Sequence, residues 1–169
     1  WALQNAFKFV RGADNKLHVA ELPVGHHLGA KPKLSMQKIG DKVLSIQGSD
    51  QADTLVPLRQ QGIETVLLAG KEGTDTYQIG RGWGYYRQII IDNHDALQST
   101  DHLCLSVMDF DKVMLVRKGN NLQLLDGHNT TLILNNVYSK QASNYRHLQI
   151  HINDSKKNIK TSVDNIIEK

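Results

Sequence analysis

The chain has one cysteine, Cys104, and three prolines among its 169 residues. A single cysteine excludes an internal disulfide framework and any zinc site built from several cysteines. No apolar run reaches the roughly 20 residues that a membrane-spanning helix needs. The opening residues, WALQNAFKFVRG, contain neither an initiating Met nor the apolar core of a signal peptide. We therefore expect no membrane span, and we expect the chain to be a piece of a longer protein.

Charge of one sign is not concentrated anywhere except in SKKNIK near the C-terminus. The formal net charge is +3, from 20 Lys and Arg against 17 Asp and Glu. Binding to nucleic acid needs a basic face or a recognisable module, so no nucleic-acid partner is expected. The hydrophobic fraction of 40% and the charged fraction of 22% are ordinary for a globular protein with a buried core.

The chain is rich in short segments that are typical of β-strands. Each contains Val, Ile, Leu or Tyr and is bounded by Gly, Asn, Asp or Ser. The segments are KLHVAEL, KVLSIQ, DTLVPL, ETVLLA, DTYQIG, RQIIID, HLCLSVM, KVMLVRK, LQLLD, TTLILNN and YRHLQIHI. This pattern predicts an all-β protein. A short helix is expected in SVDNIIEK at the end of the chain, where Ser162 suits an N-cap and Asp164 suits the first turn.

A nine-residue period runs through the middle of the chain. The apolar residues Ile46, Leu55, Leu68 and Tyr77 follow one another at steps of 9, 13 and 9. The step of 13 is a nine-residue step with four residues inserted around PLRQQG. Nine-residue periods are typical of β-rolls, in which each repeat supplies one turn and one strand and two repeats complete a coil. The sequence therefore predicts a short β-roll, or β-solenoid, of nine-residue repeats, capped by a β-hairpin sheet.

Two turns match the β-roll repeat G-G-x-G-x-D-x-U-x, in which U is a large apolar residue. Residues 70–78, GKEGTDTYQ, keep both turn glycines, the Asp and an aromatic at U. Residues 48–56, GSDQADTLV, keep the first Gly, the Asp and Leu55, but Gln51 replaces the second Gly. The turns start 70 − 48 = 22 residues apart, which is one 18-residue coil plus the four-residue insertion. We expect them to lie on the same edge, one coil apart.

Two turns in this relation can share one calcium ion, because each offers a carboxylate and backbone carbonyls. The ligands would be Asp53 and Asp75, with help from Asp50 or Glu72. The turn between them has Val66 in place of the Asp, and no further Asp follows the second turn until position 92. At most about one Ca²⁺ site is expected, and the alternative is that the turns kept their geometry without the ion.

Several motifs, in order, resemble the RTX-type haemolysin repeats and the domain that commonly closes them in large secreted bacterial toxins. The segment GTDTYQIGRGWGYYRQIIIDNHD of this chain resembles the last repeat of the family and the residues that follow that repeat. The segment TDHLCLSVMDFDKVMLVRKGNNLQLLD resembles the strand and hairpin that come next in the family. TTLILNNVY and YRHLQIHIND resemble the family's closing strands. The match covers residues 40–154 and is closest to the degenerate modules of very large virulence toxins.

The resemblance implies a non-enzymatic structural or host-receptor-binding module of a toxin that is secreted, extracellular or delivered to a host cell. Its partners would be a host-cell protein or glycan and the other domains of the toxin. We expect an N-terminal segment of unknown type, packed on the roll, over residues 1–39 and the degenerate roll over residues 40–93. A closing β-sheet domain is expected over residues 94–154, and a tail or short helix over residues 155–169. Two alternatives stay open, namely an enzymatic effector domain with an unrecognised active site and a glycan-binding, lectin-like module.

Aromatic and basic residues gather in the glycine-rich turn GRGWGYYRQ. Aromatic rings offer large rigid contact area and arginines offer forked donors, so this turn is a candidate partner-binding surface. The alternative interpretation is that the aromatic residues plug the end of the roll. The residues concerned are Trp83, Tyr85, Tyr86, Arg81 and Arg87.

No catalytic residue is expected. His147 and His151 share one strand face but lie about 13 Å apart at roughly 3.3 Å per residue, too far to bind one metal ion. Cys104 lies in an alternating strand, HLCLSVM, which lacks the helix N-terminus or glycine-framed turn that activates a thiolate. The sequence contains no phosphate-binding loop, nucleophile elbow or dinucleotide fingerprint.

Overall fold

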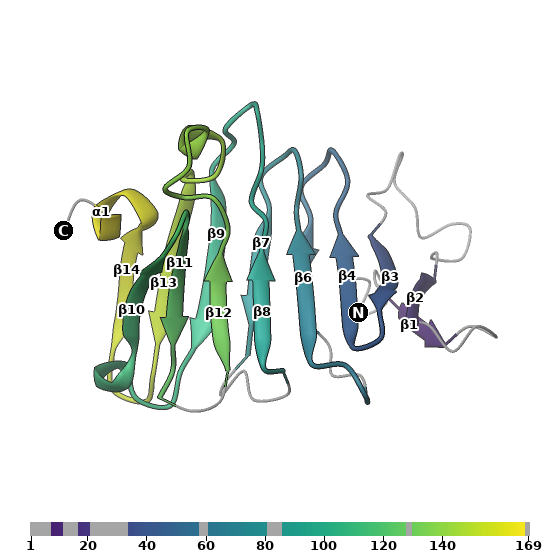
Figure 1. Ribbon diagram of the computed structural model, residues 1–169, viewed down its shortest axis with the longest axis horizontal. Coiled ribbons are helices and arrows are strands. Elements are labelled where there is room, and N and C mark those ends of the chain that lie inside the picture. Colours follow the sequence, from purple (N-terminus) through teal and green to yellow (C-terminus); the bar gives the residue numbers. More distant parts are fainter. Residues whose placement is uncertain are drawn as a thin grey trace.

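The computed structural model describes residues 8–11, 17–20, 34–57, 61–80, 86–127 and 130–167. These residues form two large β-sheets, a separate two-stranded hairpin and one short α-helix (Figure 1). The all-β prediction is therefore confirmed.

The first large sheet has seven strands in the order β10-β11-β12-β8-β6-β4-β3. Its four central strands, from β12 to β4, are parallel, and the strands at both ends join antiparallel. The strands are β3 (Ser35–Gly40), β4 (Val43–Gln47), β6 (Thr65–Ala69), β8 (Gln88–Ile91), β10 (Met114–Lys118), β11 (Asn121–Leu125) and β12 (Thr131–Leu134).

The second large sheet has five strands in the order β14-β13-β9-β7-β5, and all neighbours except β14 are parallel. The remaining described elements are the hairpin and three short helices. The strands are β5 (Thr54–Leu55), β7 (Thr76–Ile79), β9 (Asp101–Ser106), β13 (Leu148–Asn153) and β14 (Asn158–Ser162). The hairpin consists of β1 (Lys8–Arg11) and β2 (Leu17–Ala20), and the helices are η1 (Phe110–Lys112), η2 (Ala142–Asn144) and α1 (Val163–Ile167).

From β4 to β9 the chain passes alternately from one large sheet to the other. Each strand from β4 to β7 pairs in parallel with the strand two places later in the chain, so Ile46 lies beside Leu68 and Leu55 lies beside Tyr77. All four side chains are fully buried. The nine-residue apolar period of the sequence therefore corresponds to successive strands that face a common core.

Strands of the second half extend both sheets. β12 pairs in parallel with β8, and β13 pairs in parallel with β9. The predicted hairpin in KVMLVRKGNNLQLL is formed by β10 and β11, with Gly119 at a φ of +60° in its turn. Residues 94–154 thus add to the same two sheets as residues 40–93, and β3 runs across the division expected after residue 39.

The short C-terminal helix forms where the sequence predicts it. The backbone N–H of Asn165 donates to the Ser162 hydroxyl at 3.2 Å, which is an N-cap contact, and Asp164 lies in the first turn. The strand β14, directly before it, was missed by the sequence analysis. Among the described residues, no helix is long and apolar enough to cross a membrane.

Candidate functional site

A column of buried aspartates, made of Asp53, Asp75 and Asp101, crosses the five-stranded sheet at the N-terminal ends of its parallel strands. The backbone N–H of Asp53 donates to Oδ1 of Asp75 at 2.9 Å, and the N–H of Asp75 donates to Oδ1 of Asp101 at 2.7 Å. The N–H of Asp101 in turn donates to the carbonyl oxygen of His147 at 2.9 Å. These residues stand immediately before β5 and β7, at the start of β9 and immediately before β13. The column therefore links neighbouring strands by side chain as well as by backbone.

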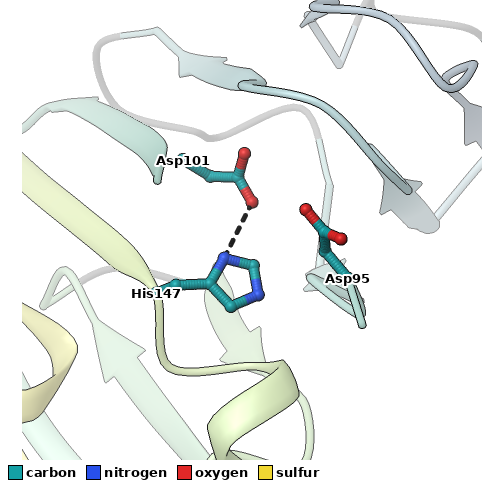
Figure 2. Close-up of side chains that lie close together, drawn as sticks. All are labelled: Asp95, Asp101 and His147. Atoms are coloured by element: carbon teal, nitrogen blue, oxygen red, sulfur yellow. Dashed lines mark ion pairs between the residues drawn. The ribbon is translucent and has the colours of Figure 1, made fainter. Parts of the chain in front are cut away.

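The column ends in a cluster of Asp95, Asp101 and His147, whose potential ligand atoms all lie within 4.8 Å of one another (Figure 2). Asp95 and Asp101 are fully buried, and the His147 side chain is 9% exposed. Nδ1 of His147 lies 3.2 Å from Oδ2 of Asp101, and Figure 2 shows the two side chains pointing toward each other. This is an ion-pair distance, but neither atom has a hydrogen-bond partner of good alignment.

The other contacts of the cluster show which nitrogen of His147 carries a hydrogen and what holds the Asp95 carboxylate. Nε2 of His147 lies 2.8 Å from the Asn144 carbonyl oxygen, so Nε2 carries a hydrogen and donates it. A neutral His147 would then aim the lone pair of Nδ1 at a carboxylate oxygen. The arrangement is favourable only with a proton or a cation between the two atoms. The Asp95 oxygens accept the backbone N–H groups of Leu97 at 2.8 Å and Ser99 at 3.1 Å, which hold that carboxylate in place.

Burial and neighbouring groups shift several pKa values in the column. Burial, assisted by the charges of Asp101 and Asp53, raises the pKa of Asp75 to about 8. Burial also raises the pKa of Asp53. For His147, burial by itself lowers the pKa, but the Asp101 carboxylate and the Asn144 carbonyl outweigh it and the net shift is upward. Below about pH 8 the favoured form of Asp75 is the neutral carboxyl, and the neighbouring Asp101 side chain favours the protonated form of His147.

The turn glycines of the repeat lie where neighbouring turns approach closely. The N–H of Gly70 donates to Oη of Tyr77 at 2.9 Å, and that hydroxyl donates to Oδ1 of Asn93 at 2.8 Å. A Cβ on Gly70 would lie 2.8 Å from Oη of Tyr77, and a Cβ on Gly48 would lie 2.5 Å from the carbonyl oxygen of Gly70. Gly73 has a φ of +97°, which favours glycine. These glycines are therefore required by packing and by backbone conformation.

The predicted calcium ligands are brought together only in part. Asp53 and Asp75 are adjacent in the column and buried, whereas Asp50 and Glu72 are exposed. Glu72 lines a surface hollow together with Asp92 and His94. In the described part of the chain, Asp95, Asp101 and His147 are the one set of three or more potential ligands close enough to share an ion. Asp95 was missed because its place beside Asp101 depends on the fold of residues 93–101.

The predicted partner-binding turn falls largely outside the described residues, since Arg81, Trp83 and Tyr85 all do so. Tyr86 is 4% exposed and belongs to the core, so its ring does not lie on the surface. Arg87 is exposed, and its Nε lies 3.9 Å from Oε1 of Glu64.

No protein-family model matches the chain, and no match was found among curated proteins. The described residues define the class as an all-β protein in which two sheets, parallel at their centres, enclose an apolar core edged by a column of buried carboxylates.

Proposed function

We propose that this chain is a non-enzymatic, RTX-like β-roll module of a large secreted bacterial toxin, in which it serves as a structural segment or binds a host receptor. The observation that carries the proposal is the alternation of β4 to β9 between two sheets, with one buried aspartate at the same place in three successive strands of the five-stranded sheet. Each complete passage through both sheets is one coil, and β12 and β13 add one more after the β10–β11 hairpin.

The aspartate column supplies a means of stacking such coils without calcium. In a calcium-binding turn the carboxylates face an ion. Here one oxygen of Asp75 and one of Asp101 accept a backbone N–H from the neighbouring coil. A neutral Asp75 is also a poor ligand for a hard cation, because it lacks the negative charge that attracts the ion. We interpret the column as the replacement for the ion in a degenerate repeat.

The chemistry of the described residues supports a non-enzymatic role. The Asp101–His147 pair resembles part of a catalytic unit, but both carboxylates of its cluster are fully buried and the imidazole is almost so. A substrate atom would need direct access to such a pair. Burial raises the pKa of Cys104, which keeps it a thiol and therefore a weak nucleophile.

The receptor-binding role is tested by measuring how the fluorescently labelled chain binds to cultured host cells. We expect saturable binding that the unlabelled chain displaces, and a marked loss of it in Trp83→Ala and in Arg87→Ala. The matched control is Lys118→Ala, which removes a basic side chain from the exposed strand β10. Melting curves of all variants would show that folding is intact.

Absence of saturable binding would contradict the receptor-binding role and leave the structural one. A cellular effect that is abolished by Asp101→Asn, with folding and cell binding unchanged, would overturn the proposal in favour of an enzymatic effector domain. The lectin-like alternative predicts glycan binding that Trp83→Ala abolishes, and unchanged glycan binding in that variant would argue against it.

A further inference from the structure

Two histidines lie side by side on the outer face of the five-stranded sheet. Nδ1 of His102 in β9 is 3.2 Å from Nε2 of His151 in β13, and the ring centroids are 5.4 Å apart. Buried and half-buried residues alternate along both strands, with Leu103 and Ile150 in the core. Both imidazoles are therefore on the half-buried face, away from the core and away from the Asp95 cluster.

The separation of the two nitrogens is that of two ligands on one metal ion. Metal-to-imidazole bonds are about 2.0–2.1 Å long. Two such bonds place their nitrogens about 2.9 Å apart at a right angle and about 3.3 Å apart at the tetrahedral angle. The observed 3.2 Å lies between these values. The alternative is a direct N–H···N hydrogen bond, which needs the same separation but no ion.

The surroundings favour a neutral imidazole at His151, which is the form that binds metals. Burial, the neighbouring His102 and the positive charge of Lys160 lower the pKa of His151. Lys160 is the β14 residue in register with His151, while β7 presents the uncharged Thr76 beside His102. The proton therefore competes more weakly with a metal ion at His151 than at an ordinary imidazole.

Cys104 is in register with His151 and lies on the same face as His102. It offers a thiol, a soft donor suited to the same metals, next to the imidazole pair. A surface hollow lined by His151, Asn158 and Lys160 opens the His151 side of the pair to solvent. Water or an incoming donor group can then fill the remaining coordination positions.

We propose that His102 and His151 form a binding site for a divalent transition-metal ion of the zinc, nickel or copper class on the open face of the five-stranded sheet. The site is independent of the calcium turn, because imidazole suits these metals and oxygen donors suit calcium. It is also independent of the role proposed for the module in a toxin.

The test is isothermal titration of the EDTA-treated, desalted chain with Zn²⁺ and, separately, with Ni²⁺ at neutral pH. Cys104→Ser is used as the background, so that the signal reports the imidazoles and not the thiol. We expect about one ion to bind per chain, with a rise in melting temperature on binding. His102→Gln and His151→Gln should each lose both signals. The matched control His94→Gln removes an exposed imidazole elsewhere on the protein and should keep both signals.

Binding that survives both glutamine variants would overturn the proposal, as would the absence of binding in the background protein. Binding that disappears in His147→Gln but persists in His102→Gln would assign the metal to the buried Asp95 cluster and would also overturn it. The melting temperatures of the metal-free variants, which we expect to be close to that of the background, separate loss of ligand from loss of folding.

Discussion

The raised pKa of Asp75 predicts that the protein loses stability as the pH rises. The pKa moves from 3.8 in the unfolded chain to about 8 in the folded protein, so folding is coupled to the uptake of one proton between these values. The contribution of this proton is fully present below pH 3.8 and is lost as the pH rises through about 8. One proton corresponds to a slope of about 1.4 kcal/mol per pH unit in the free energy of unfolding.

The perturbation that isolates this effect is Asp75→Asn. The amide oxygen can still accept the N–H of Asp53, and the amide is neutral at every pH, as the protonated carboxyl is. Between about pH 5 and pH 6.5 we expect the stability of the wild type, relative to the variant, to fall by about 1.4 kcal/mol per pH unit. His147 has a raised pKa and so contributes with the same sign, but only above 6.5. Its contribution therefore falls outside this window.

The assay is urea unfolding followed by far-ultraviolet circular dichroism at a series of pH values, with EDTA present throughout. Asp41→Asn, at an exposed acid in the turn after β3, is the matched control and should run parallel to the wild type. Parallel profiles for the wild type and Asp75→Asn would refute the reasoning, because they would mean that Asp75 binds no additional proton on folding.

Two further predictions concern the turns. Calcium added to EDTA-treated protein should leave the melting temperature unchanged, as measured by thermal melts with and without the ion; a rise that Asp75→Ala abolishes would show that the turn binds calcium. Gly70→Ala should destabilise the protein by about 2–4 kcal/mol in urea titrations, because its Cβ would lie 2.8 Å from Oη of Tyr77. In Gly80→Ala the new Cβ meets nothing within 4 Å, so equal losses in the two variants would contradict this explanation.

Much of the fold follows from local patterns in the sequence. The alternation of apolar residues indicated β2 and β4 to β13, and the spacing of Ile46, Leu55, Leu68 and Tyr77 indicated which strands stack. Such patterns work because a strand with one buried face must repeat every second residue. β1, β3 and β14 were missed. Both β3 and β14 are outermost strands of a sheet, and most residues of β3 and several of β14 are exposed, which leaves little apolar pattern.

The candidate sites were harder to predict because their residues meet across long stretches of chain. Asp53 and Asp75 are 22 residues apart, and this spacing could be read from the repeat. His102 and His151 are 49 residues apart, separated by the hairpin β10–β11 and by β12, so no fixed period connects them. The sequence places His151 near His147 on its own strand, but it carries no signal that pairs His151 with a residue of a neighbouring strand.

The buried acidic side chains affect the net charge of the protein near neutral pH. Among residues 34–57, 61–80, 86–127 and 130–167, five Asp side chains are buried, whereas no Lys or Arg side chain is. A proton on Asp75 near neutral pH raises the formal net charge from +3 to +4. Long-range attraction therefore favours an acidic partner slightly more than the composition indicates. This is a physical reason to seek the receptor of the proposed module among acidic proteins or glycans. The five buried acids are Asp53, Asp75, Asp95, Asp101 and Asp126.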